Sequence, residues 1–435
     1  MNIRKSISIL LAGAMAAGLC GCGGKSAGTD HTESTSTEKP AVQAGDPYYD
    51  VTGKRVGIVL PSATDERWKR DGAYLEEHLK EKGCEVSAVY LDAYAQEAAA
   101  KAESQASENE SAQAAADLPD PVKQMVSAGC DLLIMAKDGV VPVAEGISMA
   151  GEAGIPVIAY DELIRDTDAI SHYVSFDHYA VGQIQGQYVI DALGLSAEKT
   201  NKEYHVEFAA GDPSGLDSRY AFSGAYDTLK PLIDSGAVSV LSGQSTLSSV
   251  AREGGSEAAE KRMKEILSSS YGDGVQLDAV ICTDDEVAAG VMKAIASDYK
   301  SKHAVLITGM DKGDASFSQV TEGRQSMTVY EALEQEAVVT LDLALTVLAG
   351  DRADANLIEN SDWTFGCKYD TSSYDNGAGI VPAFLIEPVA VTSGTTGKEA
   401  EASGTAGKEA EASGTAGEAD KEAEAAAAAE GGDAA

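Results

Sequence analysis

The sequence is short of positive charge. Its 435 residues carry 33 Lys and Arg against 70 Asp and Glu, a formal net charge of −37 at pH 7. Binding to nucleic-acid phosphates requires clustered Lys and Arg, so this balance excludes a general nucleic-acid binder. The hydrophobic content of 44% is enough to fill protein cores, and the length suits two packed domains plus some unstructured sequence.

Cysteine and histidine are also scarce, with six of each. The cysteines beyond the N-terminal region show no CxxC pairing, and we expect them to be small buried apolar residues: Cys84, Cys130, Cys282 and Cys367. The histidines are scattered, so none stands beside a nucleophile in a recognisable motif. Gly211 to Gly215 (GDPSG) lacks the Lys-Ser/Thr of a phosphate-binding loop, and no Asp-rich run reproduces an EF-hand. We therefore predict no catalytic residue, no metal site and no cofactor.

Long apolar runs are missing too, and the one near the N-terminus is short. Arg4 and Lys5 precede the apolar residues 7–19, which are too few to span a membrane and predict a signal peptide over residues 1–21. The following Leu-Cys-Gly-Cys resembles a bacterial lipobox with Cys22 as the acylated thiol. We therefore expect an extracytoplasmic protein that is anchored to the membrane by lipid alone. The alternative is ordinary signal-peptide cleavage, which would release a free protein.

Three segments have too little apolar sequence to form a core. Residues 22–53 are rich in Ser, Thr, Glu and Gly and predict a flexible tether. Residues 97–119 are an Ala-, Glu- and Ser-rich insertion without apolar periodicity. Residues 393–435 carry an imperfect ten-residue repeat, SGTTGKEAEA and then SGTAGKEAEA, and predict a disordered acidic tail.

Between these segments, short β-branched runs alternate with amphipathic stretches that end in Gly. RVGIVLPS, for example, is followed by ERWKRDGAYLEEHLKEKG, and the pattern repeats through LDAVICTD and HAVLITGMD. Continuous apolar strands separated by helices predict an α/β fold with parallel sheets covered on both faces. The units are too many for one small sheet, so we expect two doubly wound lobes. The apolar run SHYVSFD (residues 171–177) closely follows the preceding strand, and the short segment between them leaves little room for a helix. We place the crossing between the lobes there.

Charged and aromatic side chains follow several of these strands. Ligands of open parallel sheets bind at the carboxyl ends of the strands, so these positions are candidate binding residues. Each of them could instead cap the next helix. Hydroxyl-rich ligands suit this mixture, because carboxylates accept hydroxyl hydrogens, guanidinium groups donate to oxygens, and an aromatic face covers the C–H side of a sugar. The candidates are Arg67, Trp68, Asp161, Glu162, Asp217, Arg219, Asp284, Asp285, Asp311 and Glu331.

Several of these segments occur in family order and carry a specific resemblance. They are DERWKRDG (65–72), VIAYDELI (157–164), SFDHYAVGQIQGQYV (175–189), LDAVICTDDEVAAGV (277–291), ITGMDKGD (307–314), GRQSMTVYEAL (323–333) and YDNGAGIVPAFLIEPVAV (374–391). The chain resembles the periplasmic-binding-protein-like (type 1) substrate-binding lipoproteins of ABC sugar importers, and most closely the xylose-binding and multiple-monosaccharide-binding proteins.

The resemblance implies two Rossmann-like lobes that are joined by a three-strand hinge and close over one sugar in the cleft between them. Mapped onto this chain, the first lobe comprises residues 54–174 plus 331–380. The second lobe comprises residues 175–330 plus 381–391. Closure of such a hinge would bury the ligand and present a composite surface to the transmembrane subunits of an ABC permease. The binding protein itself is expected to be a monomer.

The resemblance also assigns ligand-binding roles, and here the sequence departs from the family. Arg67, Trp68, Asp161 and Asp311 match the family pattern. Glu162 stands where the family has Arg, Asp284 where it has Asn, and Glu331 where it has Lys or Gln. In the turn at SGLD, Asp217 is the plausible match, and Arg219 stands where several relatives have a basic residue. The Trp expected after the following strand is Gly255.

Two questions stay open at this point. The acidic replacements each add negative charge, which would suit an amino sugar or another cationic polyol, because clustered carboxylates in a closing cleft repel one another. Alternatively, Glu162 and Glu331 point away from the ligand or pair with Arg67 and Arg219, and the ligand is an ordinary monosaccharide. The sequence also does not distinguish delivery to an ABC permease from sensing through a histidine kinase or chemoreceptor.

Overall fold

The computed structural model describes residues 50–105, 119–136, 141–196, 202–272, 274–311 and 315–395. The predicted signal peptide, Cys22, most of the tether, residues 106–118 of the insertion and the tail beyond residue 395 lie outside these ranges. Within them, no helix combines the length and the apolar character needed to cross a membrane. Three of the four described cysteines are buried as expected, Cys367 is half-buried, and all four are free thiols.

A seven-stranded sheet forms the first lobe, with the strand order β12-β13-β5-β4-β3-β1-β2. Its strands are β1 (Arg55–Leu60), β2 (Glu85–Tyr90), β3 (Leu132–Met135), β4 (Val157–Tyr160), β5 (Ile170–Phe176), β12 (Cys367–Asp370) and β13 (Ala383–Ile386). All neighbouring strands run parallel except β12 and β13, which pair antiparallel. β4 and β5 are joined by residues 161–169 without a helix, as the sequence pattern predicts.

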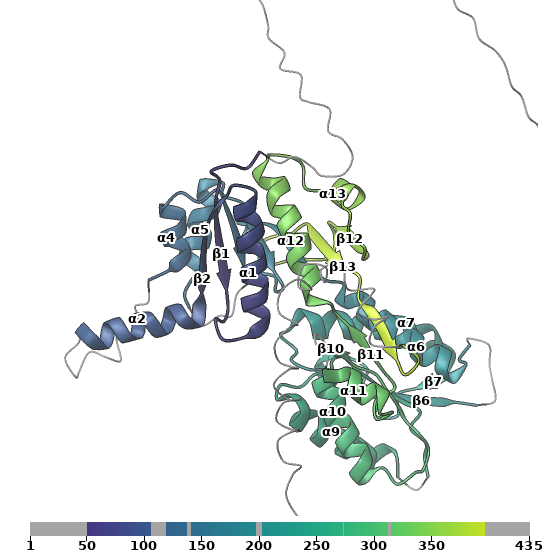
Figure 1. Ribbon diagram of the computed structural model, residues 1–435. Helices are drawn as coiled ribbons and strands as arrows, with labels where there is room; N and C mark the ends of the chain where they lie inside the picture. Colours follow the sequence, from purple (N-terminus) through teal and green to yellow (C-terminus); the bar gives the residue numbers. More distant parts are fainter. Residues whose placement is uncertain are drawn as a thin grey trace, which may run out of the picture. The chain divides into compact units, whose positions relative to one another are not determined.

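Helices cover both faces of this sheet because its strands are apolar on both sides. α1 (Glu66–Glu81), α12 (Leu333–Leu348) and α13 (Ala355–Asn360) lie on the face that contains Ile58 and Ile134, and α1 packs against α12 (Figure 1). α4 (Pro121–Ser127) and α5 (Ala144–Ala153) cover the face that contains Val59 and Leu133. α2 (Leu91–Gln105) follows β2.

The second lobe contains two short sheets, β7-β6-β8-β9 and β10-β11-β14. Their strands are β6 (Tyr204–Ala209), β7 (Val238–Ser239), β8 (Ala279–Cys282), β9 (Leu306–Ile307), β10 (Met310–Asp311), β11 (Met327–Tyr330) and β14 (Val389–Thr392). Thr308 and Gly309 separate β9 from β10, but the Thr308 N–H donates to the Val280 carbonyl at 3.2 Å and the Gly309 carbonyl accepts from Val329 N–H at 2.9 Å. The hydrogen-bonded ladder therefore continues from one sheet to the other.

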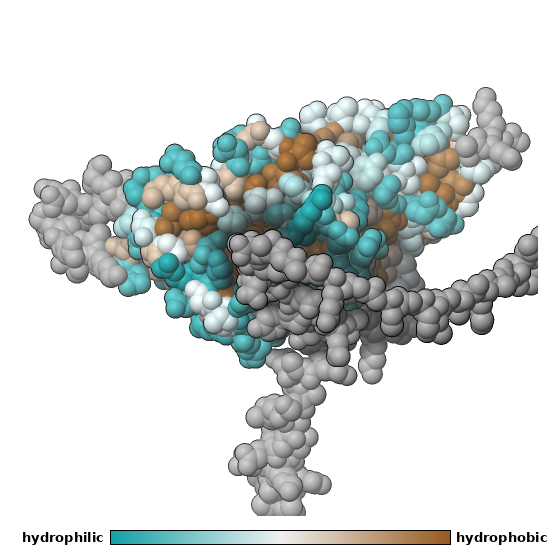
Figure 2. All heavy atoms as spheres, turned by 90° about the horizontal axis from the view of Figure 1, so that it is seen from above, coloured by the Kyte–Doolittle hydropathy of each residue, from teal (hydrophilic) through white to brown (hydrophobic). Residues whose placement is uncertain are grey.

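Pairs of closely packed helices cover this second sheet. α6 (His178–Leu193) packs on α7 (Leu216–Ser235), and α9 (Gly255–Ser270) packs on α10 (Asp285–Asp298). The short helices α8 (Leu247–Val250) and α11 (Ala315–Thr321) complete the lobe. On the face shown in Figure 2, small hydrophobic areas alternate with hydrophilic ones.

The chain passes between the lobes at three points. These are the step from β5 to α6, the step from β11 to α12, and the step from β13 to β14. The α/β prediction with two lobes of mainly parallel strands is confirmed, whereas placing all of residues 381–391 in the second lobe is wrong. β13 lies in the first sheet, between β5 and β12, because Phe384 and Ile386 fill the core beneath α12. Only β14 joins the second lobe, by pairing with β11.

Candidate functional site

Asp161 follows β4 in an unusual backbone conformation. Its φ angle of 68° lies in the left-handed region, which is uncommon for residues other than Gly and which Asp tolerates better than most. The Asp161 N–H donates to the Val174 carbonyl at 3.0 Å. The hydroxyls of Tyr173 and Ser175 donate to the Asp161 carbonyl at 2.8 and 3.0 Å. Strand β5 thus fixes Asp161 at the carboxyl end of β4, where ligands of parallel sheets bind.

Arg67, in the first turn of α1, lies against Asp161. Its Nη2 atom donates to Asp161 Oδ1 at 2.8 Å and to Glu336 Oε2 at 2.8 Å. Its Nε atom is 3.6 Å from Asp71 Oδ2, and Asp71 and Glu336 are both buried. Burial opposes the positive charge, but the carboxylates of Asp161 and Glu336 outweigh it and raise the pKa of Arg67. The guanidinium is therefore permanently charged and held by three carboxylates.

Trp68 lies next to this ion-pair cluster. The Arg67 guanidinium carbon is 4.3 Å from the centre of the Trp68 ring, a cation–π contact. The Trp68 ring packs edge-on against Tyr160, with the ring centres 6.0 Å apart. The Tyr160 hydroxyl donates to Asp71 Oδ2 at 2.9 Å, and burial together with the Asp71 charge raises the pKa of Tyr160. Trp68 is thus held in place by polar and apolar neighbours while remaining half-buried.

A cavity of about 510 Å³ lies beside Asp161 and is lined by both lobes. The first lobe contributes residues 161–165 and Tyr173, and the second contributes Asp212 and residues 214–218 at the start of α7. The same helix start contacts the first lobe through Tyr220, whose hydroxyl donates to the Ser373 carbonyl at 2.7 Å. Three predicted site residues, Asp161, Glu162 and Asp217, therefore line one cavity.

Asp284 lies at the carboxyl end of β8 and caps α10. Its Oδ1 accepts from the Val287 N–H at 2.8 Å and its Oδ2 accepts from the Thr283 hydroxyl at 3.1 Å. Burial, followed by the charges of Glu286 and Asp217, raises the pKa of Asp284. The helix-cap interpretation and closeness to the candidate site therefore both apply to this residue. Asp285, its neighbour, instead accepts from the Thr328 hydroxyl at 2.9 Å within the second lobe.

The remaining predicted residues lie in different surroundings. Glu331 is fully buried, with Oε1 3.2 Å from Nε2 of the buried His178. Asp311 is half-buried, and its carbonyl accepts from the Glu331 N–H at 3.2 Å. Glu162 and Arg219 are exposed. Glu331 is not among the ion-pair partners of Arg67, which are Asp71, Asp161 and Glu336.

Sequence reasoning missed Glu336 and Asp71. Glu336 carries a signal that could have identified it, because it precedes Thr340 and Leu343 by four and seven residues. That spacing places its carboxylate on the buried face of an otherwise apolar helix. A buried acid requires a partner, and Arg67 is 269 residues away in sequence.

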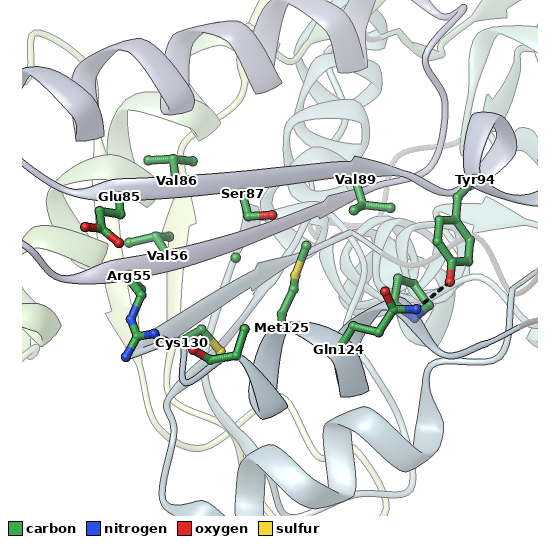
Figure 3. A pocket seen from close by; sticks show the side chains of 13 residues that line it. Arg55, Val56, Glu85, Val86, Ser87, Val89, Tyr94, Gln124, Met125 and Cys130 are labelled. Carbon is green, nitrogen blue, oxygen red and sulfur yellow. Dashed lines mark hydrogen bonds between the residues drawn. The ribbon is translucent and has the colours of Figure 1, made fainter. Parts of the chain in front are cut away.

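A second cavity, of about 500 Å³, lies over β1 and β2 beside α4 (Figure 3). Its lining is largely apolar and includes Val56, Val86, Val89 and Met125, and Gln124 donates to the Tyr94 hydroxyl at one end. None of the predicted site residues lines it. The cavity beside Asp161 is therefore the better candidate for a polar ligand.

Comparison with known proteins identifies the family of this chain. Residues 56–352 match the family described as periplasmic binding protein domain. The multiple sugar-binding periplasmic protein SbpA of Azospirillum brasilense is 30% identical over 344 residues, which cover 77% of this chain and 85% of that protein. The multiple sugar-binding periplasmic receptor ChvE of Rhizobium radiobacter is 29% identical over 343 residues, covering 77% and 86% respectively.

The fold of this chain is also similar to that of a solved structure. An ABC transporter solute-binding protein from Clostridium phytofermentans, with bound β-D-glucose, is 34% identical with a TM-score of 0.58. The match covers 78% of this chain and 94% of that one. These relatives are binding proteins and not enzymes. The chain therefore belongs to the periplasmic binding protein domain family, alongside sugar-binding proteins of ABC transporters.

Proposed function

We propose that this chain is an extracytoplasmic, lipid-anchored solute-binding protein that captures a monosaccharide by hinge closure and delivers it to an ABC permease. The family match and the sugar-binding relatives support this function. The lipid anchor rests on the Leu-Cys-Gly-Cys sequence that ends at Cys22. The three crossings between the lobes are the elements about which such closure would occur.

One observation carries the sugar-binding proposal, namely the pairing of Asp161 with Arg67 beside a cavity. A fixed carboxylate and a fixed guanidinium, 2.8 Å apart, offer an acceptor and a donor to neighbouring hydroxyl groups of one ligand. Trp68 adds an aromatic ring next to them. The cavity volume of about 510 Å³ lies within the range of small-molecule sites. Asp217 supplies a carboxylate from the second lobe.

The surroundings of the acidic replacements favour a neutral monosaccharide. Glu162 is exposed, Glu331 is buried beside His178, and Asp284 caps α10. Each of these carboxylates thus has a setting that does not require a cationic ligand. The amino-sugar alternative is supported by a different observation, because Asp217 contributes to the raised pKa of Asp284. A ligand amine next to this pair of carboxylates would relieve their repulsion.

A sensor role is the alternative to import. The relative from Rhizobium radiobacter is described as a receptor, which supports this second candidate. Both roles require the same ligand capture and differ only in the docking partner. Adjacent permease and ATPase genes would support import, and an adjacent histidine-kinase gene would support sensing.

A ligand screen tests the proposal directly. The chain from residue 23 onward is heated with D-glucose, D-xylose, D-galactose or D-glucosamine, and its melting temperature is followed as a function of ligand concentration. A ligand that binds only the folded state raises the melting temperature, so neutral aldoses are expected to stabilise the protein. Stabilisation by glucosamine alone would favour the cationic ligand, and no shift with any sugar would contradict sugar binding.

A further inference from the structure

The three nitrogens of the Arg67 guanidinium differ in the number of partners they contact. Both Nη2 hydrogens are committed, one to Asp161 Oδ1 and one to Glu336 Oε2, each at 2.8 Å. Nε faces Asp71 at 3.6 Å. Within the described ranges, Nη1 forms neither a hydrogen bond nor an ion pair, and 15% of the Arg67 side chain is exposed. The two Nη1 hydrogens are therefore uncommitted among the described residues, although Arg67 itself is not one of the residues that line the cavity beside Asp161.

Glu336 holds Arg67 from the protein interior. It lies in the first turn of α12 and its side chain is 0% exposed, so it does not reach a ligand in the cavity. A guanidinium is planar and rigid. Two acceptors on Nη2 and a third carboxylate facing Nε therefore fix its plane, and with it the direction in which the Nη1 hydrogens point.

Loss of Glu336 would leave the guanidinium with one fewer constraint. Asp161 could still pair with Nη2 and Asp71 would still face Nε, but the planar group would lose one of the three carboxylates that fix its orientation. The charge of Arg67 would remain, because its pKa is already far above neutral pH. Loss of Glu336 is therefore expected to disturb the orientation of the Arg67 guanidinium and to leave its charge unchanged.

We propose that Glu336 is a positioning residue of the binding site, which orients Nη1 of Arg67 toward one ligand oxygen without touching the ligand. This inference rests on the proposed function, in which Arg67 contacts the sugar. A purely structural Glu336 would join α1 to α12 and affect stability alone. The two roles make different predictions about ligand selectivity.

The test compares sugars that differ by one hydroxyl. D-glucose and its singly deoxygenated analogues are titrated by calorimetry against the wild-type chain, Arg67→Met, Glu336→Gln, and the double variant. The hydroxyl that meets Arg67 is the one whose removal costs affinity in the wild type and no longer does in Arg67→Met. Glu336→Gln is expected to weaken glucose binding about tenfold, as for one weakened charge-assisted hydrogen bond, and to lose discrimination at that same hydroxyl.

The double variant and two controls complete the design. In the Arg67→Met background, Glu336→Gln is expected to leave the glucose dissociation constant unchanged, because the proposed effect of Glu336 on the ligand is transmitted through Arg67. Glu334→Gln, a change of the same kind two residues earlier on α12, is expected to retain wild-type selectivity. Glu336→Asp keeps the negative charge but moves the carboxylate away from Arg67, because the side chain is one methylene shorter. It should therefore lose the same discrimination between glucose and the deoxy sugar. It replaces Glu336→Gln in the experiment if that variant does not fold.

The outcomes separate this inference from the proposed function. If the wild type binds glucose and Glu336→Gln only lowers the melting temperature, with selectivity intact, the positioning role is overturned and sugar binding stands. The positioning role would also be overturned if Glu336→Gln reduced glucose affinity by the same factor in the wild type and in the Arg67→Met background. If the wild type binds none of the sugars, the proposed function fails and the inference fails with it.

Discussion

At the scale of single residues, two aspartates illustrate how backbone geometry and burial prepare a site. Asp161 adopts a left-handed conformation that costs on the order of 1 kcal/mol or more for a residue with a side chain. Hydroxyls of Tyr173 and Ser175 offset that cost by bonding its carbonyl. Asp284 is a half-buried carboxylate whose ionised form is disfavoured by its surroundings, which raise its pKa.

Replacing Asp161 by Asn should weaken ligand binding with little change in fold. Asn tolerates the left-handed conformation and matches the shape of Asp, but it lacks the charge that pairs with Arg67. We expect a glucose affinity lower by about 10- to 100-fold, the range for a lost charge-assisted hydrogen bond, in a calorimetric titration. Asp166→Asn is the matched control, since Asp166 also has a positive φ angle, 59°, and lies outside the residues that line the cavity. Equal affinities for the two variants would count against Asp161 as a ligand residue.

Replacing Asp284 by Asn should stabilise the ligand-free protein at neutral pH. Because the folded-state pKa of Asp284 is raised, its favourable contribution is present below the unfolded pKa of about 3.9 and is lost as the pH rises through the folded value. Asn can still cap α10 but carries no charge. Calorimetry from pH 4 to pH 8 should show a melting temperature a few degrees above wild type at pH 7, with a gap that narrows toward pH 4.

Asp284→Ala distinguishes the charge from the helix cap. This variant removes both, so it should be less stable than Asp284→Asn by about 1 kcal/mol at every pH. A gap between Asp284→Asn and wild type that does not vary with pH would refute the charge explanation.

At the scale of elements, glycine permits the close approach of paired helices. A Cβ atom on Gly182 of α6 would lie 1.9 Å from the Ala221 carbonyl oxygen of α7. On the facing helix, a Cβ on Gly224 would lie 2.0 Å from the Tyr179 carbonyl oxygen. The contacting atoms are backbone and have little freedom to move. The two helices are therefore in contact along a seam that admits no side chain.

Gly182→Ala should separate α6 from α7 and destabilise the second lobe. Ala is favoured over Gly in a helix by about 1 kcal/mol, but the clash with backbone atoms is expected to outweigh this by about 1–3 kcal/mol. Urea unfolding at 25 °C measures the change. Gly272→Ala is the control, because a Cβ there meets nothing within 4 Å and its φ angle is not positive. A Gly182→Ala variant as stable as Gly272→Ala would show that the seam adapts.

Elements also show what the sequence could and could not predict. The alternation of apolar runs with amphipathic stretches predicts the α/β class because it reflects local periodicity. β13 (AFLI) is buried on both faces, and such a strand carries no information about which sheet it joins. Asp161 and Arg67 were predictable because strand ends and helix starts are visible in sequence. The contact of Arg67 with Glu336 was not, since only the packing of α1 on α12 creates it.

At the scale of the whole molecule, three chain crossings join the lobes, and buried titratable side chains lie at two of them. His178 begins α6 directly after the first crossing, and Glu331 follows β11 at the second. Their side chains are 3.2 Å apart and buried. Asp177, beside His178, pairs with Lys368 of β12. The first two crossings are thus linked to each other by side chains, and the first is also linked to β12 of the first sheet.

Ligand binding should change the shape of the molecule if the crossings act as a hinge. Saturating D-glucose is expected to reduce the radius of gyration in small-angle X-ray scattering, because closure brings the lobes together. The Asp161→Asn variant at the same sugar concentration should show a smaller reduction, in line with its lower affinity. A wild-type radius that stays constant at saturation would contradict hinge closure.

The cation–π contact of Trp68 has a consequence for how binding can be observed. The sequence contains two tryptophans, and they differ in their surroundings. Trp68 lies 4.3 Å from the Arg67 guanidinium, whereas Trp363 stacks on Phe365 and donates from its indole nitrogen to Asp342 at 2.8 Å. A sugar that displaces water beside Trp68 should alter the emission of that indole and leave Trp363 as a constant reference. The protein would then report its own occupancy by fluorescence without a label, and Trp68→Phe would silence the signal while Trp363→Phe would not.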